Sequence, residues 1–311
     1  MNIVEVNGLV KRYKELVALD NFSLTIEQGE IFGLLGPNGS GKTTAINCIL
    51  QLLTYDKGEI ELFGQPMSPT RYDLKRRIGI VPQNIAVFSQ LNVTENIDYF
   101  CSLYVEDKNE RRQLVEEAIQ FVGLEDFRKF RPRKLSGGLM RRLNIACGIA
   151  HKPELIIFDE PTVAVDPQSR NAILEGIQRL RDQGSTVIYT SHYMEEVEQI
   201  CTRIMIMDKG QALAIGTNTE LKSMVGVNER IEIELAESDE KVVELVRELP
   251  HTASVLLAEN TLRVSCTQGS HNLSEVLTAL QSADVAYGRV YSEPPTLNDV
   301  FLEITGKELR D

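Results

Sequence analysis

The sequence lacks hydrophobic runs long enough to form a membrane span. No apolar stretch approaches the roughly 18 residues that a membrane helix needs, and its apolar runs are strand-sized, such as Ile31 to Leu35 and Leu155 to Phe158. The first residues, Met1 to Glu5, also lack the basic and apolar regions of a signal peptide. We therefore expect a cytosolic protein that reaches a membrane only through a partner.

Paired cysteines are missing as well. The five cysteines are odd in number, scattered, and contain no Cys-x-x-Cys pair: Cys48, Cys101, Cys147, Cys201 and Cys266. This pattern argues against a disulfide framework and against a zinc site, so we expect reduced, mostly buried thiols.

Positive charge is scarce, above all towards the end of the chain. The net charge is -12, and the residues from Glu220 onward hold 8 basic and 17 acidic side chains, a balance of -9. Such a segment repels nucleic acid and anionic lipid headgroups. We therefore expect no nucleic-acid partner, although a local basic patch stays possible.

The first 81 residues have the pattern of short strands around a glycine-rich loop. Segments rich in β-branched and apolar residues, bounded by turn residues, predict five strands: Ile3 to Val6, Phe22 to Ile26, Ile31 to Leu35, Gly58 to Phe63 and Ile78 to Val81. The third runs into the glycine loop, and apolar residues then recur at helical spacing from Thr43 to Leu53.

Residues 84 to about 150 predict a helical subdomain inserted into an α/β core. Three segments read as helices: Asn92 to Tyr104, Arg111 to Val122 and Gly137 to Ala150. Strands and helices then alternate, which favours a largely parallel sheet covered by helices. The alternating segments are Leu155 to Phe158, Pro167 to Gln183, Thr186 to Thr190, Met194 to Cys201 and Ile204 to Met207.

A second, smaller unit follows a loosened pattern near residues 217–228. Strands and helices are expected at 230–236, 239–248, 253–258, 261–266, 272–282 and 286–291. This β-α-β-β-α-β order is ferredoxin-like. A last helix follows Pro295, with Thr296 as its N-cap, Asp299 at the third helical position and Gly306 as its stop. We predict two domains, at 1–220 and 228–311.

The glycine loop fits the phosphate-loop pattern G-x-x-x-x-G-K-[ST]. It reads Gly36, Pro37, Asn38, Gly39, Ser40, Gly41, Lys42 and Thr43, and Thr44 follows. Glycines let the backbone wrap a polyphosphate, and the helix beginning near Lys42 adds its positive N-terminal end. We expect Lys42 to bind the β- and γ-phosphates and the Thr43 hydroxyl to bind Mg²⁺. The preceding strand and following helix predict a phosphate-loop NTPase.

Two carboxylates end the apolar strand that begins at Leu155. Asp159 and Glu160 should lie at the carboxyl edge of the sheet, where ligands bind in open α/β folds. Asp159 is the expected Mg²⁺ partner, and Glu160 is placed to orient or deprotonate an attacking water. Taken alone, an acidic strand end facing solvent is an equal alternative.

A second candidate anion site begins at Ser136. This residue reads as an N-cap before Gly137 and Gly138, which open an apolar helix. Taken alone, the segment is better explained as an ordinary capped helix.

These motifs, in this order over residues 1 to about 220, resemble the ATP-binding cassette ATPases. The resemblance implies that Gly36–Thr43 is the Walker A loop for ATP, that Asp159 and Glu160 end Walker B, and that Ser136 to Leu139 form the signature motif. It also implies single-residue roles: Tyr13 stacks on adenine, Gln83 senses Mg²⁺, Asp166 crosses the dimer interface, and His192 contacts the γ-phosphate.

Cassettes of this family work in pairs, so the resemblance implies a homodimer. The signature residues Ser136 to Gly138 of one copy would cap ATP held by the Walker A loop of the other. Two departures are visible: Leu139 replaces the usual glutamine of the signature, and Val163 and Val165 precede Asp166 where a small polar residue and a leucine are common.

The final segment, Glu293 to Phe301, resembles that of detached ATPase subunits of bacterial exporters of the daunorubicin- and linearmycin-resistance type. This implies a separate membrane permease and a place on the cytoplasmic face of the membrane. Rival interpretations are an importer ATPase, a soluble cassette ATPase acting on chromosomes or ribosomes, and a non-catalytic regulator. The short distance from Thr43 to Ser136 leaves no room for the long coiled coil of chromosome-type members, and ribosome-type members carry two cassettes.

Overall fold

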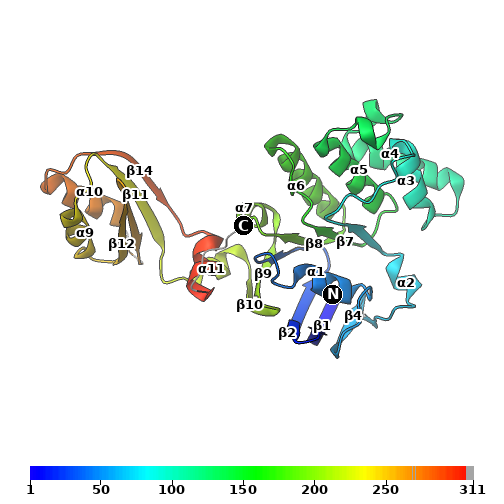
Figure 1. The fold of residues 1–311 in the computed structure, drawn as a ribbon, viewed down its shortest axis with the longest axis horizontal. Coiled ribbons are helices and arrows are strands. Elements are labelled where there is room, and N and C mark those ends of the chain that lie inside the picture. The colour runs from blue at the N-terminus through cyan, green and yellow to red at the C-terminus, as the bar shows by residue number, and fades with distance from the viewer. Residues whose placement is uncertain (268, 270, 306–311) are drawn as a thin grey trace. The chain divides into compact units, whose positions relative to one another are not determined.

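The computed structural model describes residues 1–267, 269 and 271–305, and Figure 1 shows its elements. The chain divides into two compact units, the first ending at Asn218 and the second beginning at Thr219. The predicted Gly306 stop lies outside the described residues.

The centre of the first unit is a six-stranded sheet in the order β10-β9-β3-β8-β7-β6. All its pairings are parallel except that of β10 with β9. Its strands are β3 (Ile31–Leu35), β6 (Ile78–Val81), β7 (Leu155–Asp159), β8 (Thr186–Ser191), β9 (Arg203–Asp208) and β10 (Gln211–Gly216). Every residue of β3, β7 and β8 is buried, as expected of parallel strands covered on both faces.

A second sheet, antiparallel, has the order β2-β1-β4-β5. It is formed by β1 (Asn2–Tyr13), β2 (Leu16–Glu27), β4 (Lys57–Leu62) and β5 (Gln65–Pro66). One buried apolar cluster includes residues of this sheet, of α1 (Lys42–Ile49) and of the central sheet, among them Val6, Ile46, Ile49 and Leu34. Strands β1 and β2 pair antiparallel as one long hairpin, and the predicted strands Ile3 to Val6 and Phe22 to Ile26 are parts of it.

The helical insertion has its own core. Helices α3 (Val93–Ser102), α4 (Lys108–Val122) and α5 (Gly137–Ile149) pack around buried residues such as Ile97, Ile119 and Leu143. The predicted capping box is present at Asn92, and α4 begins earlier than expected because the Asp107 side chain accepts from the N–H groups of Asn109 and Glu110.

Helices α6 (Pro167–Asp182) and α7 (Met194–Ile200) complete the first unit, together with the short α2 (Tyr72–Lys75). The sequence analysis did not identify α2, β5, β10 or α8 (Asn218–Ser223). Each is short, and none has a long periodic pattern. Among the described residues, no helix combines the length and the apolar character needed to cross a bilayer.

The second unit confirms the ferredoxin-like prediction. Its strands are β11 (Glu229–Leu235), β12 (Thr252–Ala258), β13 (Thr261–Cys266) and β14 (Tyr287–Glu293), in the antiparallel order β12-β13-β11-β14. Helices α9 (Glu240–Arg247) and α10 (Asn272–Ser282) contribute to its core, and α11 (Leu297–Thr305) follows. Thr296 directly precedes α11, as predicted. Its N–H (2.7 Å) and its hydroxyl (2.9 Å) both donate to the Asp299 carboxylate, so in these two hydrogen bonds Thr296 is the donor and the Asp299 side chain is the acceptor.

Candidate active site

The predicted site residues follow four neighbouring strands of the central sheet, at the edge formed by the carboxyl ends of those strands. The phosphate loop follows β3, Gln83 follows β6, Glu160 follows β7 and His192 follows β8. The register pairs Leu35 with Ser191 and Asp159 with Thr190. Because β3, β8, β7 and β6 are parallel neighbours, their carboxyl ends meet, and side chains up to about 150 positions apart in the sequence come together.

The phosphate loop needs glycine at two positions for different reasons. A Cβ on Gly36 would lie 2.3 Å from the carbonyl oxygen of Met207. Gly41 has a φ of +107°, and its Cβ would lie 2.8 Å from the carbonyl oxygen of Ala18. Asn38 and Gly39 are exposed, so the concave loop is open to a ligand. Gly41 immediately precedes α1, whose first N–H groups therefore border the loop.

Lys42 is buried and its ammonium lies over the loop. Its Nζ donates to the carbonyl oxygens of Gly36 (2.7 Å) and Pro37 (3.2 Å), and lies 3.5 Å from Glu160 Oε1. Burial lowers the pKa of Lys42, while the carboxylates of Glu160 and Asp159 oppose that shift. The ammonium is thus placed to bind a phosphate oxygen without a long side-chain movement.

Asp159 is held between two hydroxyls. Its Oδ2 accepts from Thr43 Oγ1 at 3.1 Å, and its Oδ1 accepts from Thr190 Oγ1 at 2.7 Å. The exposed Thr43 hydroxyl and the Asp159 carboxylate form an oxygen pair of the kind that Mg²⁺ takes beside phosphate and water.

Glu160 lies at the centre of the site. Its Oε2 accepts from Gln83 Nε2 at 2.9 Å, and its Oε1 lies 3.4 Å from His192 Nδ1. Its N–H donates to Thr190 Oγ1 at 2.9 Å, and its φ is +47°, a left-handed conformation that is costly for a non-glycine residue. The Thr190 hydroxyl therefore ties the Asp159 carboxylate to the backbone of Glu160. Sequence reasoning missed it, although its place immediately before Ser191-His192 on a buried strand was an available signal.

Tyr13 ends β1 with 44 % of its surface exposed and Lys11 Nζ 4.9 Å from its ring centroid. The ring is accessible for stacking. No described hydrogen bond or ion pair joins it to the loop.

The second candidate anion site is at the N-terminus of α5. Ser136 caps α5 by accepting from the N–H of Leu139 at 3.3 Å, and Gly137 is exposed with open space around it. A Cβ on Gly138 would lie 2.4 Å from Ser169 Oγ and 3.4 Å from Asp166 Oδ2. Asp166 caps α6 through the N–H of Ser169 at 2.9 Å, a hydrogen bond that lowers its pKa. Among the described contacts, none joins Ser136, Gly137, Gly138 or Asp166 to the phosphate loop.

The departures from the family pattern have simple structural counterparts. Leu139 packs against the apolar core of the helical subdomain, so its side chain serves packing where a glutamine would offer polar atoms. Val165 is also buried, at 8 % exposure, immediately before the exposed Asp166.

Comparison with known proteins agrees with this geometry. Residues 19–163 match the family "ABC transporter", and residues 216–305 match "ATP-binding protein DrrA1-3-like, C-terminal domain". The linearmycin resistance ATP-binding protein LnrL of Bacillus subtilis is 38 % identical, over 99 % of this chain and 100 % of that protein. The daunorubicin resistance ATP-binding protein DrrA3 of Streptomyces coeruleorubidus is 34 % identical, over 99 % and 97 %.

Solved structures show the same fold for the first unit. A dimeric post-hydrolysis structure of the cassette MJ0796 bound to ADP and Pi is 28 % identical, with a TM-score of 0.63 over 69 % of this chain and 98 % of that one. Fold, motif geometry and full-length similarity agree, and the chain belongs to the ABC transporter family, among the ATP-binding subunits with a DrrA1-3-like C-terminal domain.

Proposed function

We propose that this chain is the Mg²⁺-dependent ATPase subunit of a bacterial exporter, that it works as a homodimer, and that it drives a separate membrane permease from the cytoplasmic face. The observation that carries the proposal is the convergence of Lys42, Gln83 and His192 on the carboxylate of Glu160.

Each residue at the sheet edge has a role in this proposal. The loop N–H groups and Lys42 bind the β- and γ-phosphates, and Tyr13 stacks on adenine. Glu160 accepts the proton of the attacking water, while His192 contacts the γ-phosphate. Thr43 and Asp159, with Gln83 nearby, would hold Mg²⁺, which neutralises phosphate charge when bound.

The second candidate anion site supports a dimer. Ser136 and Gly137 are exposed, and no described contact joins them to the phosphate loop of their own chain. In this proposal they cap ATP bound to a second copy. Asp166, exposed beside Gly138, would lie at the same contact between copies.

An apolar groove near Gln83 supports a permease contact. A cavity of about 260 Å³ is lined by residues that include Ile80, Pro82, Ala86, Phe100 and Leu103. Ile85, Phe88 and Tyr99 nearby are each about 40 % exposed. Such a patch suits an apolar helix end from a membrane partner. Gln83 follows Pro82, which lines the groove, and donates to Glu160, so it would link the partner to the catalytic site.

The names of the relatives suggest the class of cargo. They include resistance proteins for linearmycin and daunorubicin and Nod factor export proteins of Rhizobium meliloti and Burkholderia thailandensis. We infer an amphipathic drug, antibiotic or lipid-like cargo. The DrrA1-3-like C-terminal domain favours an exporter over an importer ATPase or a cassette acting on ribosomes or chromosomes.

The first test is the variant Glu160→Gln, with Glu175→Gln, an exposed carboxylate on α6, as its matched control. We expect Glu160→Gln to lower ATP turnover at least 100-fold, because it removes the proton acceptor, while ATP affinity changes less than threefold. The measurements are phosphate release and equilibrium ATP binding. Wild-type turnover in Glu160→Gln would refute the role of Glu160.

The second test concerns the partner. The tagged chain is isolated from detergent-solubilised membranes, and co-purifying proteins are identified. The proposal expects a polytopic permease without a cassette of its own. Recovery of ribosomes, or of a permease with a periplasmic binding protein, would contradict it.

A further inference from the structure

A buried carboxylate lies behind the candidate active site, and no role proposed above uses it. Glu196, in the first turn of α7, is 2 % exposed. Its Oε2 accepts three hydrogen bonds, from Tyr189 OH (2.7 Å), Thr162 Oγ1 (2.8 Å) and Ser191 Oγ (3.0 Å). A buried carboxylate is costly unless it is paired and hydrogen-bonded, so this cluster is a specific arrangement.

Two of these donors flank the site residues in sequence. Ser191 immediately precedes His192, and its oxygen also accepts from the N–H of Tyr193 at 2.9 Å. The backbone on both sides of His192 is therefore tied to one hydroxyl, which is itself bound to Glu196. Thr162 lies two residues after Glu160, on the loop that leaves β7. One carboxylate oxygen thus holds both the His192 segment and the Glu160 segment.

The charge of Glu196 has one counterion among the described residues. Arg170 Nε lies 3.3 Å from Glu196 Oε1, and its guanidinium lies 5.1 Å from the ring centroid of Tyr193. Arg170 is on α6, and its N–H donates to the carbonyl oxygen of Asp166 at 2.9 Å. Burial and the nearby Glu196 raise the pKa of Tyr189 well above its usual value, so its phenol stays a donor to the carboxylate.

We propose that Glu196 is a positioning residue for ATP hydrolysis, which holds His192 at its 3.4 Å distance from Glu160 by fixing Ser191 and Thr162 together. The inference rests on the proposed function, because it concerns the same reaction. Among the described contacts, none joins Glu196 to the phosphate loop. Its effect is therefore on the rate of the chemical step, and ATP affinity is unaffected.

The test compares Glu196→Gln with Glu195→Gln in the full-length chain. Glutamine keeps the volume but replaces one carboxylate oxygen with an amide that donates, so three hydroxyls and Arg170 can no longer all be satisfied. Glu195 is exposed on the same helix and is the matched control. We expect Glu196→Gln to lower kcat about tenfold with ATP affinity within twofold of wild type, and Glu195→Gln to match wild type in both.

A double-mutant cycle separates positioning from general stabilisation. Because Glu196 acts through His192, Glu196→Gln should cause no further loss of kcat in a His192→Ala background. If the fold losses of kcat from Glu196→Gln and His192→Ala multiply in the double variant, Glu196 has a merely structural role and the inference is overturned. Ser191→Ala removes only the hydroxyl beside His192, and it should give a smaller loss of kcat with the same cycle behaviour, so the inference stays testable if Glu196→Gln does not fold.

The outcomes distinguish the two proposals. A wild-type chain that turns over ATP, with Glu196→Gln and Ser191→Ala indistinguishable from Glu195→Gln, overturns the role of Glu196 alone. A wild-type chain that binds ATP but does not hydrolyse it overturns the proposed function and this inference with it.

Discussion

At the scale of single residues, burial decides which carboxylates can do chemistry. Asp159 and Glu160 are 8 % and 7 % exposed, and each accepts hydrogen bonds from side chains of other segments. Asp166, in contrast, is exposed and caps a helix. The same functional group therefore serves as a metal-ligand candidate, a base candidate or a helix cap according to its surroundings.

His151 gives a testable consequence of burial at this scale. Its ring stacks on Tyr104 with centroids 3.8 Å apart, and its Nε2 donates to the carbonyl oxygen of Ile78 at 3.2 Å. Burial lowers its pKa from 6.5 to about 4. Between these values the unfolded chain binds a proton that the folded chain does not. The contribution of neutral His151 to the free energy of unfolding is therefore complete above pH 6.5. It falls by on the order of 3 kcal/mol as the pH drops towards 4.

The variant His151→Phe keeps the stacked ring but cannot titrate. Urea unfolding at pH 7, 6 and 5 should show a shallower loss of stability in the variant than in the wild type. Identical pH slopes would mean that His151 is not held neutral in the folded protein.

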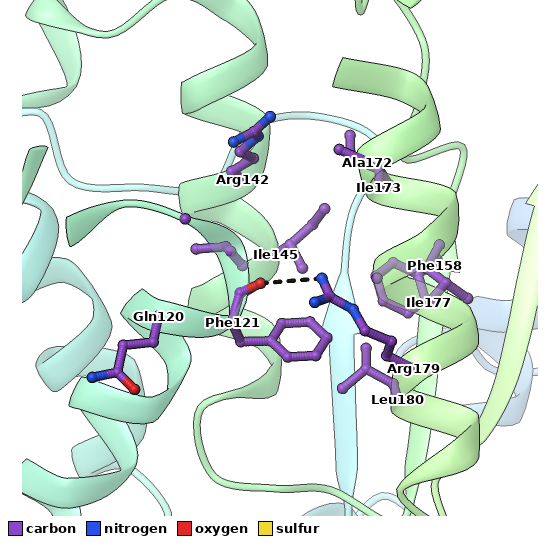
Figure 2. A pocket seen from close by; sticks show the side chains of 13 residues that line it. Gln120, Phe121, Arg142, Ile145, Phe158, Ala172, Ile173, Ile177, Arg179 and Leu180 are labelled. Carbon is purple, nitrogen blue, oxygen red and sulfur yellow. Dashed lines mark hydrogen bonds between the residues drawn. The ribbon is translucent and has the colours of Figure 1, made fainter. Parts of the chain in front are cut away.

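At the scale of elements, the contact between the helical subdomain and the core sets where α5, and so Ser136, is presented. A cavity of about 260 Å³ is lined by residues of α4, α5 and α6, among them Phe121, Ile145 and Ile177. Figure 2 shows these side chains. Arg179 crosses the cavity, with its Nη2 3.4 Å from the carbonyl oxygen of Phe121 and its guanidinium 4.8 Å from the ring centroid. This contact bridges the subdomain and the core.

Two glycines in helices, Gly176 and Gly148, provide a matched pair of positions for testing how tightly α6 and α5 pack against their neighbours. A Cβ on Gly176 of α6 would lie 3.7 Å from Phe121, an ordinary contact facing the cavity. Gly176→Ala should therefore stabilise the protein by about 0.5–1 kcal/mol, because alanine favours the helix. A Cβ on Gly148 of α5 would lie 2.6 Å from the carbonyl oxygen of Ile80, so Gly148→Ala should destabilise it. Thermal unfolding of both variants tests this prediction. A Gly148→Ala variant more stable than the Gly176→Ala variant would contradict the packing described.

At the scale of the whole molecule, the two units have separate apolar cores. The first has clusters around α1 and around α3 to α5, and the second has its own cluster around β11 and β13. The candidate ATP-binding residues all belong to the first unit. Ligand binding to it should therefore stabilise one unit directly.

Calorimetry can test this division. In the Glu160→Gln variant, which should retain ATP, we expect two unfolding transitions. ATP at about 100 times its Kd should stabilise only the first unit, by about 2.7 kcal/mol. A Lys42→Ala variant should lack that shift, since it removes the phosphate contact. A single transition that moves as a whole with ATP would contradict independent units.

The local patterns of the sequence were sufficient for much of this protein. Hydrophobic periodicity predicted the long helices and the buried strands, since each depends on neighbours within a few residues. The spacing of Gly36 to Thr43 predicted the phosphate loop, and the β-α-β-β-α-β order predicted the fold of the second unit. Short elements such as α2 and β10 were missed because their formation depends on tertiary contacts.

The chemistry of the site was decided only by tertiary structure. Gln83 and Glu160 are 77 positions apart, and Thr43 and Asp159 are 116 apart, yet each pair is in hydrogen-bonding contact. The structure alone showed that Thr190 joins the Asp159 carboxylate to the Glu160 N–H, and that Glu196 accepts from Ser191 beside His192. Local sequence patterns predict where a strand ends and which side chains lie at that end. Which strand ends are neighbours depends on the pairing order of the sheet, and that order brings the chemical groups together.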